Sequence, residues 1–147
     1  MDTDNPIRDF ENRVPPNDAK AVIDDAISKI SGSPEINDWF KSYAKNHRNR
    51  LAFDFQTVST QLNKSDLIVE CGSAPFILTQ SLNENGYNIV GLDIAPARFQ
   101  KTIELNRLNV KECDIETARL PFEDNSAGCV LFNQPVSYTH LTLPTKA

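Results

Sequence analysis

Residues 66–76 read DLIVECGSAPF, and this stretch decides the fold class that the sequence predicts. A short continuous apolar run before a glycine turn is typical of a strand buried on both faces of a parallel sheet. Glu70 lies at the end of that run, and Gly72 follows it after one residue. Burying a carboxylate is costly unless the group is paired or hydrogen-bonded. Glu70 therefore indicates that this strand ends at a functional site.

The segments after this stretch alternate between strand-like and helix-like patterns. We predict strands at 66–71, 87–93, 109–114 and 129–133, helices at 75–82 and 96–108, and a loop at 120–128. Strands that alternate with helices are typical of α/β proteins with a doubly wound parallel sheet. The sequence therefore predicts a Rossmann-like, mostly parallel sheet of four strands.

The chain before the sheet has two parts. Residues 1–17 are polar, contain three prolines and are predicted to be a flexible lead-in. From residue 18 to 62 the apolar residues recur at helical spacing, as at Val22, Ala26 and Ile30, so this part is predicted to be a helical lead. Ser33 and Pro34 suit the start of a second helix, which continues as one long helix or as two. Residues 63–136 then form the predicted sheet domain.

Composition limits the possible functions. The formal net charge is −5, which argues against nucleic acid as the main partner, and the basic run at 45–50 is predicted to be a solvated helix face. The three cysteines are odd in number and form no C-x-x-C pair, so neither a disulfide framework nor a metal site is predicted. Nothing resembles a signal peptide or a membrane span, which predicts no membrane partner and a cytoplasmic location.

Polar residues stand at the end of every predicted strand: Glu70, Asp93, Asp114 and Asn133. Ligands of open α/β sheets bind outside the carboxyl ends of the strands, so these side chains are predicted to line one crevice. Asp93 ends the second strand roughly 20 residues beyond the glycine turn, where a ribose-binding carboxylate is found in nucleotide-binding sheets.

The glycine turn itself indicates which nucleoside would bind. A dinucleotide site needs several glycines for close approach of the pyrophosphate, but here Gly72 is followed by Ala74 and Phe76. Glu70 would also repel a diphosphate. A cationic nucleoside without phosphate fits better, and S-adenosyl-L-methionine, with its ammonium and sulfonium groups, is such a molecule. Glu70 would then attract the cationic end of the ligand.

These segments resemble a known family. LIVECGSAPF, NIVGLDIAP and KECDIETARLPFEDNSAGCVLFN are similar, in order and spacing, to the first motifs of class I S-adenosylmethionine-dependent methyltransferases of the type 11-like group. The resemblance implies cofactor contacts for eight residues: Glu70, Gly72 and Ser73 at the methionine end, Asp93 at the ribose, Ile94 against the adenine, Asp114 at the adenine amino group with Ile115 beside it, and Asn133 near the transferred methyl group.

The resemblance also marks what this chain lacks. The family's sheet has more strands than the four predicted here, so the chain is expected to be an N-terminal fragment. Residues 137–147 match neither a strand nor a helix pattern and are expected to be a non-native tail.

The alternatives are therefore a methyltransferase with an unidentified acceptor or a non-catalytic, vestigial adenosyl-binding module. A nicotinamide-dependent oxidoreductase is third. Methyl transfer rests largely on positioning, so no catalytic residue is assigned, and His47 and His140 are not predicted to be bases.

Overall fold

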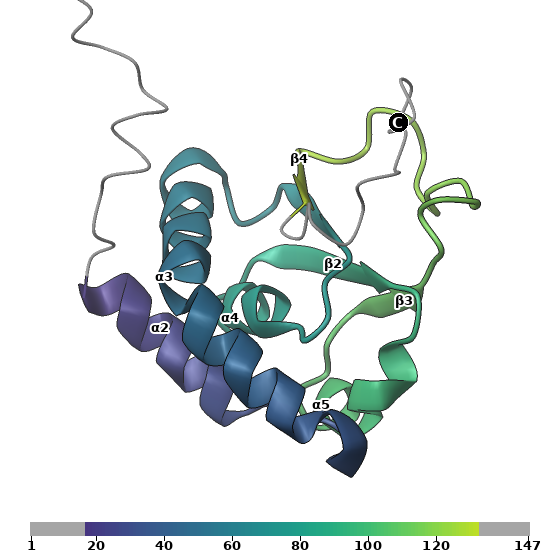
Figure 1. Cartoon of the computed structure of the whole chain (residues 1–147). Coiled ribbons are helices and arrows are strands. Elements are labelled where there is room, and N and C mark those ends of the chain that lie inside the picture. Colours follow the sequence, from purple (N-terminus) through teal and green to yellow (C-terminus); the bar gives the residue numbers. More distant parts are fainter. Residues whose placement is uncertain (1–16, 133–147) are drawn as a thin grey trace, which may run out of the picture.

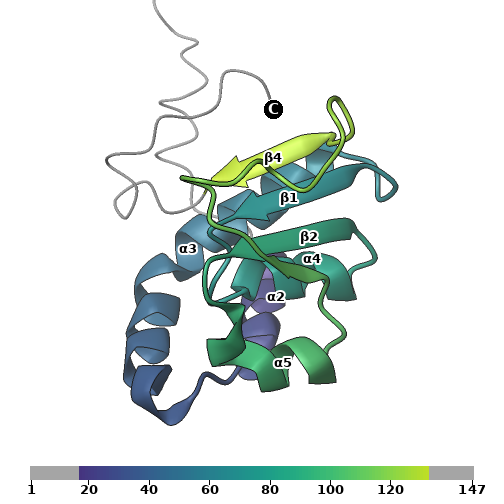
Figure 2. The ribbon, with the colours of Figure 1, turned by 90° about the vertical axis from the view of Figure 1, so that its right-hand side faces the viewer.

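Within residues 17–132 the sheet has four parallel strands, as the sequence predicts. The structure, a computed structural model, describes residues 17–132. The strands are β1 (Leu67–Cys71), β2 (Asn88–Asp93), β3 (Val110–Glu112) and β4 (Cys129–Phe132), and their order in the sheet is β3-β2-β1-β4 (Figure 2). Chain order reverses beside β1, which makes the ends of β1 and β4 the switch point where such sheets bind ligands. The predicted Rossmann-like α/β fold is confirmed for the described residues.

Helices cover one face of this sheet. They are α2 (Asn17–Ser28), α3 (Asn37–Gln61), α4 (Ile77–Glu84) and α5 (Gln100–Leu105), with short 3-10 segments η1 (Pro34–Ile36) and η2 (Pro96–Phe99) (Figure 1). One hydrophobic core joins α2, α3 and α4 to β1 and β2. It contains fully buried side chains from each layer, among them Ile23, Leu51, Ile68 and Leu78. The helical lead therefore packs as part of the same core as the sheet.

The opposite face of the sheet carries a smaller apolar cluster. Val69, Cys71, Val90, Leu92 and Cys113 are buried there. The connection from β3 to β4 passes over this face, from one edge of the sheet to the other (Figure 2). This connection has no helix, so its apolar side chains cover the face only in part.

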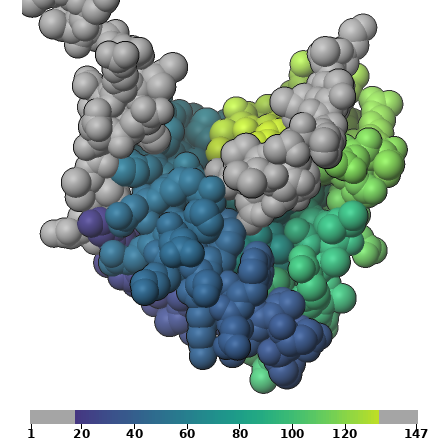
Figure 3. Space-filling model, in the orientation of Figure 1, coloured from purple at the N-terminus to yellow at the C-terminus, as the bar shows by residue number. Residues whose placement is uncertain are grey.

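The lead is attached to the segment that follows β2. Ser31 exchanges two hydrogen bonds with the Thr102 hydroxyl: its amide donates at 2.9 Å and its carbonyl accepts at 3.0 Å. The Ser33 amide donates to the Arg98 carbonyl at 3.0 Å. In Figure 3 the blue surface of α3 adjoins the green surface of the segments after β2. The link between them therefore holds η2 and α5 in a defined position.

Several predicted boundaries shift. The second lead helix is one helix of 25 residues. The helix predicted from residue 75 begins at Ile77, because Phe76 takes the left-handed conformation with φ 69°. The helix predicted at 96–108 is a 3-10 turn followed by α5, which ends at Leu105. The predictions for residues 1–16, Asn133 and the tail at 137–147 lie outside the described residues.

Two arginines of the basic run at 45–50 contact other residues of this chain. Arg48 forms an ion pair with Asp24 of α2, and the Arg50 guanidinium donates to the Tyr43 hydroxyl at 3.0 Å.

Cys71, which stands beside the glycine turn, is buried, and burial raises the pKa of its thiol to about 11. No helix within residues 17–132 has the length and apolarity needed to cross a membrane.

Candidate functional site

The carboxyl ends of β1, β2 and β3 lie side by side. Cys71 pairs with Leu92 in the sheet, and Asp93 pairs with Glu112. The residues just past these ends surround a hollow of about 160 Å³, lined by Gly72, Asp93, Ile94, Cys113, Asp114, Ile115 and Glu116. Five of the eight predicted residues thus meet at one place, although they come from three separate segments of the chain. That convergence is what the parallel arrangement of the strands was expected to produce.

The glycine turn folds onto the end of β2. Gly72 has φ 63°, a conformation that glycine adopts without steric cost. The Ser73 amide donates to the Leu92 carbonyl at 2.9 Å, and the Ala74 amide points to Asp93 Oδ1 at 3.4 Å. Gly91 of β2 allows this close approach, because a Cβ atom there would lie 2.6 Å from Ser73 Oγ. The turn and the end of β2 therefore form one rigid wall of the site.

Asp93 is the most constrained side chain of the hollow. It is 6% exposed. Its Oδ2 accepts from the Ala95 amide at 2.9 Å and lies 3.4 Å from the Arg98 guanidinium. Its Oδ1 has the long contact to the Ala74 amide. The two oxygens therefore differ, since Oδ2 is held by the η2 turn while Oδ1 retains capacity to accept further hydrogen bonds.

The third strand contributes a short polar turn. Asp114 Oδ1 accepts from the Glu116 amide at 3.0 Å, and the Asp114 carbonyl accepts from the Ala118 amide at 2.8 Å. Ile94 is 60% exposed and Ile115 is half-buried, and both line the hollow. The site thus combines two apolar side chains with acidic groups, and such a mixed lining is typical of small-molecule sites.

Glu70 lies behind the hollow and does not line it. The side chain is 2% exposed, and its Oε1 accepts a hydrogen bond from the Thr79 hydroxyl of α4 at 2.8 Å. Ser73 is also buried and outside the lining, and Asn133 lies outside the described residues. The buried Glu70 carboxylate is thus hydrogen-bonded by a helix that packs on the neighbouring strand β2. Its role at the cofactor, and those of the other seven residues, stay predictions.

Comparison with known proteins identifies the family. The family model described as "Methyltransferase domain" matches residues 69–147, which is more than half of the chain. The chain belongs to this methyltransferase domain family. The predicted resemblance to S-adenosylmethionine-dependent methyltransferases is confirmed at this level. The match also runs through residues 137–147, and the expected non-native tail stays a prediction.

Solved structures similar to this chain cover only part of it. One is a putative S-adenosyl-L-methionine-dependent methyltransferase from Methanococcus maripaludis, with 19% identity and a TM-score of 0.49 over 58% of this chain and 42% of that one. Another is the Pyrococcus abyssi tRNA (uracil-54, C5)-methyltransferase in complex with S-adenosyl-L-homocysteine, with 16% identity and a TM-score of 0.40 over 52% of this chain and 21% of that one. This chain therefore spans less than half the length of either. No curated protein matches.

Sequence reasoning missed four side chains in or beside the candidate site: Arg98, Cys113, Glu116 and Thr79. Cys113 and Glu116 flank the predicted Asp114 and Ile115, so strand-end reasoning could have included them. Burial raises the pKa of the Cys113 thiol, which keeps it protonated at neutral pH. Arg98 follows Asp93 on a short turn that no periodic pattern reveals. Within residues 17–132, no group of side chains is arranged to hold a metal ion.

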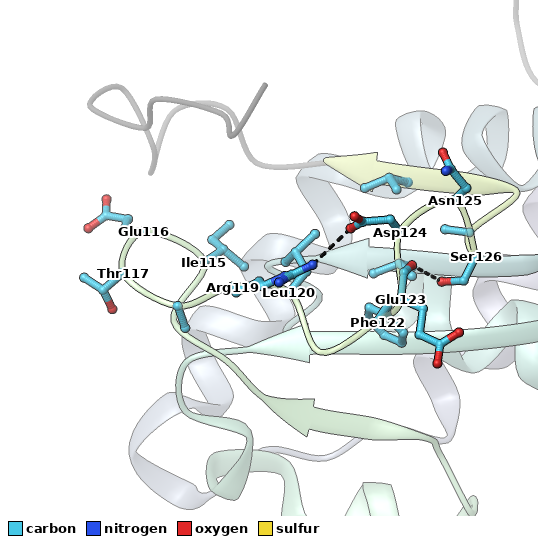
Figure 4. A pocket seen from close by; sticks show the side chains of 14 residues that line it. Ile115, Glu116, Thr117, Arg119, Leu120, Phe122, Glu123, Asp124, Asn125 and Ser126 are labelled. Atoms are coloured by element: carbon cyan, nitrogen blue, oxygen red, sulfur yellow. Dashed lines mark hydrogen bonds and ion pairs between the residues drawn. The ribbon is translucent and has the colours of Figure 1, made fainter. Parts of the chain in front are cut away.

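A larger hollow of about 480 Å³ lies over the sheet face beneath the β3–β4 connection (Figure 4). Its floor includes Val69 and Val130, and it shares Ile115 and Glu116 with the smaller hollow. Arg119 and Asp124 form an exposed ion pair across it at 3.2 Å. The smaller hollow is the candidate site, because ligands of open α/β sheets bind outside the strand ends.

Proposed function

We propose that this chain carries the cofactor-binding part of an S-adenosylmethionine-dependent methyltransferase, which transfers a methyl group from the sulfonium to an acceptor. The observation that carries the proposal is the convergence of Gly72, Asp93 and Asp114 on one hollow at the strand ends. Family membership supports the reaction class. No residue within 17–132 identifies the acceptor.

The residues present fit an adenosyl group. Asp93 Oδ1 retains capacity to accept from ribose hydroxyls, because its contact to the Ala74 amide is long at 3.4 Å. Ile94 and Ile115 offer apolar surface for a flat base, and Asp114 Oδ2 is available to accept from an amino group, since Oδ1 takes the Glu116 amide. The hollow is smaller than typical pockets for whole ligands, which are about 300–1,000 Å³, so it suits the nucleoside part of the cofactor.

The charge of the site favours a cation over a diphosphate. Asp93, Asp114 and Glu116 line the hollow, and Glu70 is buried just behind the glycine turn. Charges in a partly buried site interact more strongly than in water. We infer that Gly72 and Ser73 flank the methionine end of the cofactor and that the Glu70 carboxylate favours its cationic groups through space. Asn133 is proposed to lie near the transferred methyl group.

The side chain of Phe76 does not obstruct the glycine turn. Its ring is fully buried and packs against Phe99 with ring centroids 5.6 Å apart, so it points into the core under α3 and not into the hollow. Phe76 adopts the positive φ that glycine takes most easily. Phe76 therefore leaves the shape of the glycine turn intact, which favours an adenosyl-binding site over a decayed one.

The chain's contribution to catalysis is positional. When bound, the cofactor would supply a methyl group on a positively charged sulfur, and this sulfur would leave as a neutral thioether when an acceptor nucleophile takes the methyl group in line. The wall formed by the glycine turn and Asp93 would fix the ribose and thereby the direction in which that methyl group points. Holding two reactants in line accounts for a large part of such a rate enhancement, so no dedicated base is needed from these residues.

The proposal is tested by calorimetry of the full chain with S-adenosylhomocysteine and with NAD. We expect binding of the first and none of the second. Asp93→Ala should weaken binding by about 1.5–3 kcal/mol, the range for hydrogen bonds to a charged group. Asp93→Asn should lose less, because one acceptor oxygen remains.

Asp124→Ala serves as a control, because Asp124 is exposed and its ion pair with Arg119 lies outside the smaller hollow. It should bind with unchanged affinity. The proposal fails if S-adenosylhomocysteine does not bind. The ribose assignment fails if Asp93→Ala binds like the unaltered chain.

A further inference from the structure

Arg98 contacts the carboxylate that the proposed function places at the ribose. Its Nη2 lies 3.4 Å from Asp93 Oδ2, and its Nε donates to the Ala95 carbonyl at 3.1 Å. The Ala95 amide in turn donates to the same Oδ2 at 2.9 Å. Arg98, Ala95 and Asp93 therefore form a closed set of contacts that engages one carboxylate oxygen, while the other, Oδ1, has a long contact of 3.4 Å to the Ala74 amide.

The backbone under Arg98 is fixed by the core and by the lead. The next residue, Phe99, is 1% exposed and packs edge-on against Phe40 of α3 and Phe76 of the turn. The Arg98 carbonyl accepts from the Ser33 amide of the linker between α2 and α3. The guanidinium thus extends from an anchored position toward Asp93. Its side chain is 40% exposed, whereas that of Asp93 is 6% exposed, so the carboxylate is the buried partner of the pair.

The terminal torsion of Asp is broad, so the plane of a free carboxylate can turn about χ2. A carboxylate held at Oδ2 by an amide and a guanidinium loses that freedom before any ligand arrives. Preorganised groups bind better because less ordering remains to be done on association.

We propose that Arg98 is a positioning residue for ribose recognition: by holding Asp93 Oδ2, it keeps Oδ1 directed at the ribose hydroxyls. This inference rests on the proposed function of the hollow. Arg98 itself does not line the hollow and acts through Asp93. Its effect should therefore depend on both the carboxylate and the ribose hydroxyls.

The test compares Arg98→Met and Arg98→Lys with the unaltered full chain in calorimetric titrations. The ligands are S-adenosylhomocysteine and its 2′,3′-dideoxy analogue. Arg98→Met should bind S-adenosylhomocysteine about three- to fivefold more weakly, the scale of a partly exposed ion pair. Arg98→Lys should recover part of the loss, because it keeps the charge but not the planar fork of donors. Neither variant should change the affinity for the dideoxy analogue.

Two further variants make the result specific. Arg48→Met removes an arginine from an exposed ion pair with Asp24 of α2. Neither residue lines the hollow, so this variant should bind like the unaltered chain. In an Asp93→Ala chain, adding Arg98→Met should cause no further loss, since the partner is already gone. Circular dichroism of each variant confirms folding before titration.

The outcomes distinguish a failure of this inference from a failure of the proposed cofactor-binding function. No binding of S-adenosylhomocysteine by the unaltered chain overturns both. Binding by the unaltered chain together with an equal loss for the two ligands in Arg98→Met overturns the inference alone, because the effect would not pass through the ribose. An additive loss in the double variant overturns it as well.

Discussion

Gly91→Ala is expected to destabilise the fold by pushing on the glycine turn. Gly91 lies in β2, paired with Glu70 of β1. A Cβ atom there would stand 2.6 Å from Ser73 Oγ, 3.1 Å from Thr79 Oγ1 and 3.3 Å from Ser73 Cβ. Ser73 and Thr79 are both buried, so neither side chain has open space to enter. One added methyl group therefore acts on two side chains of the site at once.

The magnitude follows from what each neighbour would lose. Ser73 Oγ can rotate away at the expense of a long hydrogen bond to the Leu92 carbonyl, 3.3 Å in length. Thr79 has less freedom, because its hydroxyl donates to the buried Glu70 carboxylate at 2.8 Å. Inserting a methyl group into a packed interior costs about 1–3 kcal/mol. We expect a loss of about 2 kcal/mol in the free energy of unfolding, the middle of that range.

The assay is urea unfolding followed by circular dichroism, with a rescue variant. Adding Ser73→Ala to Gly91→Ala removes the atom at 2.6 Å and should restore about 1 kcal/mol, a coupling of the size found between residues in contact. Gly128→Ala is the matched control, since Gly128 is exposed and the nearest atom to its added Cβ is Asp66 Cβ at 3.0 Å. A Gly91→Ala chain as stable as the control, or one that Ser73→Ala does not relieve, would refute the reasoning.

Two other predictions concern the core and α3. Phe76→Ala should lower the free energy of unfolding by about 3–5 kcal/mol, because a buried ring is lost. Phe76→Gly should be about 1 kcal/mol more stable than Phe76→Ala in urea unfolding, because φ 69° strains alanine but not glycine. Equal stabilities of the two variants would show that this strain is absent. Burial raises the pKa of Asp54 from 3.8 to about 6, although the Arg50 guanidinium opposes the shift, and Asp54 Oδ2 has no hydrogen-bond partner in the described part of the chain. The folded state then holds a proton that the unfolded state releases between about pH 4 and 6, so this contribution to stability is present below pH 4 and lost as the pH rises through 6. Asp54→Asn should therefore gain stability relative to the unaltered chain as the pH rises from 4 to 7, and parallel pH profiles of unfolding free energy would contradict the assignment.

The sequence by itself determined the order and type of the main elements. A continuous apolar run such as LIVEC needs burial on both faces, which only a covered parallel sheet provides, and the acid at the end of each of the first three strands follows from the chain alone. Asp93, Asp114 and the glycine turn could therefore be named from the order of residues, because in parallel strands the position along the chain determines the edge of the sheet.

The tertiary structure decided the contacts between distant segments. Thr79 reaches Glu70 only because α4 packs back on β2, the neighbour of β1, and Gly91 of β2 allows that approach by lacking a side chain. Arg98 meets Asp93 only because η2 is held by Phe99 and by the Ser33 amide of the lead. Local patterns report burial and periodicity, but they carry no information on which side chains meet across the fold, since that depends on how the helices pack against the sheet.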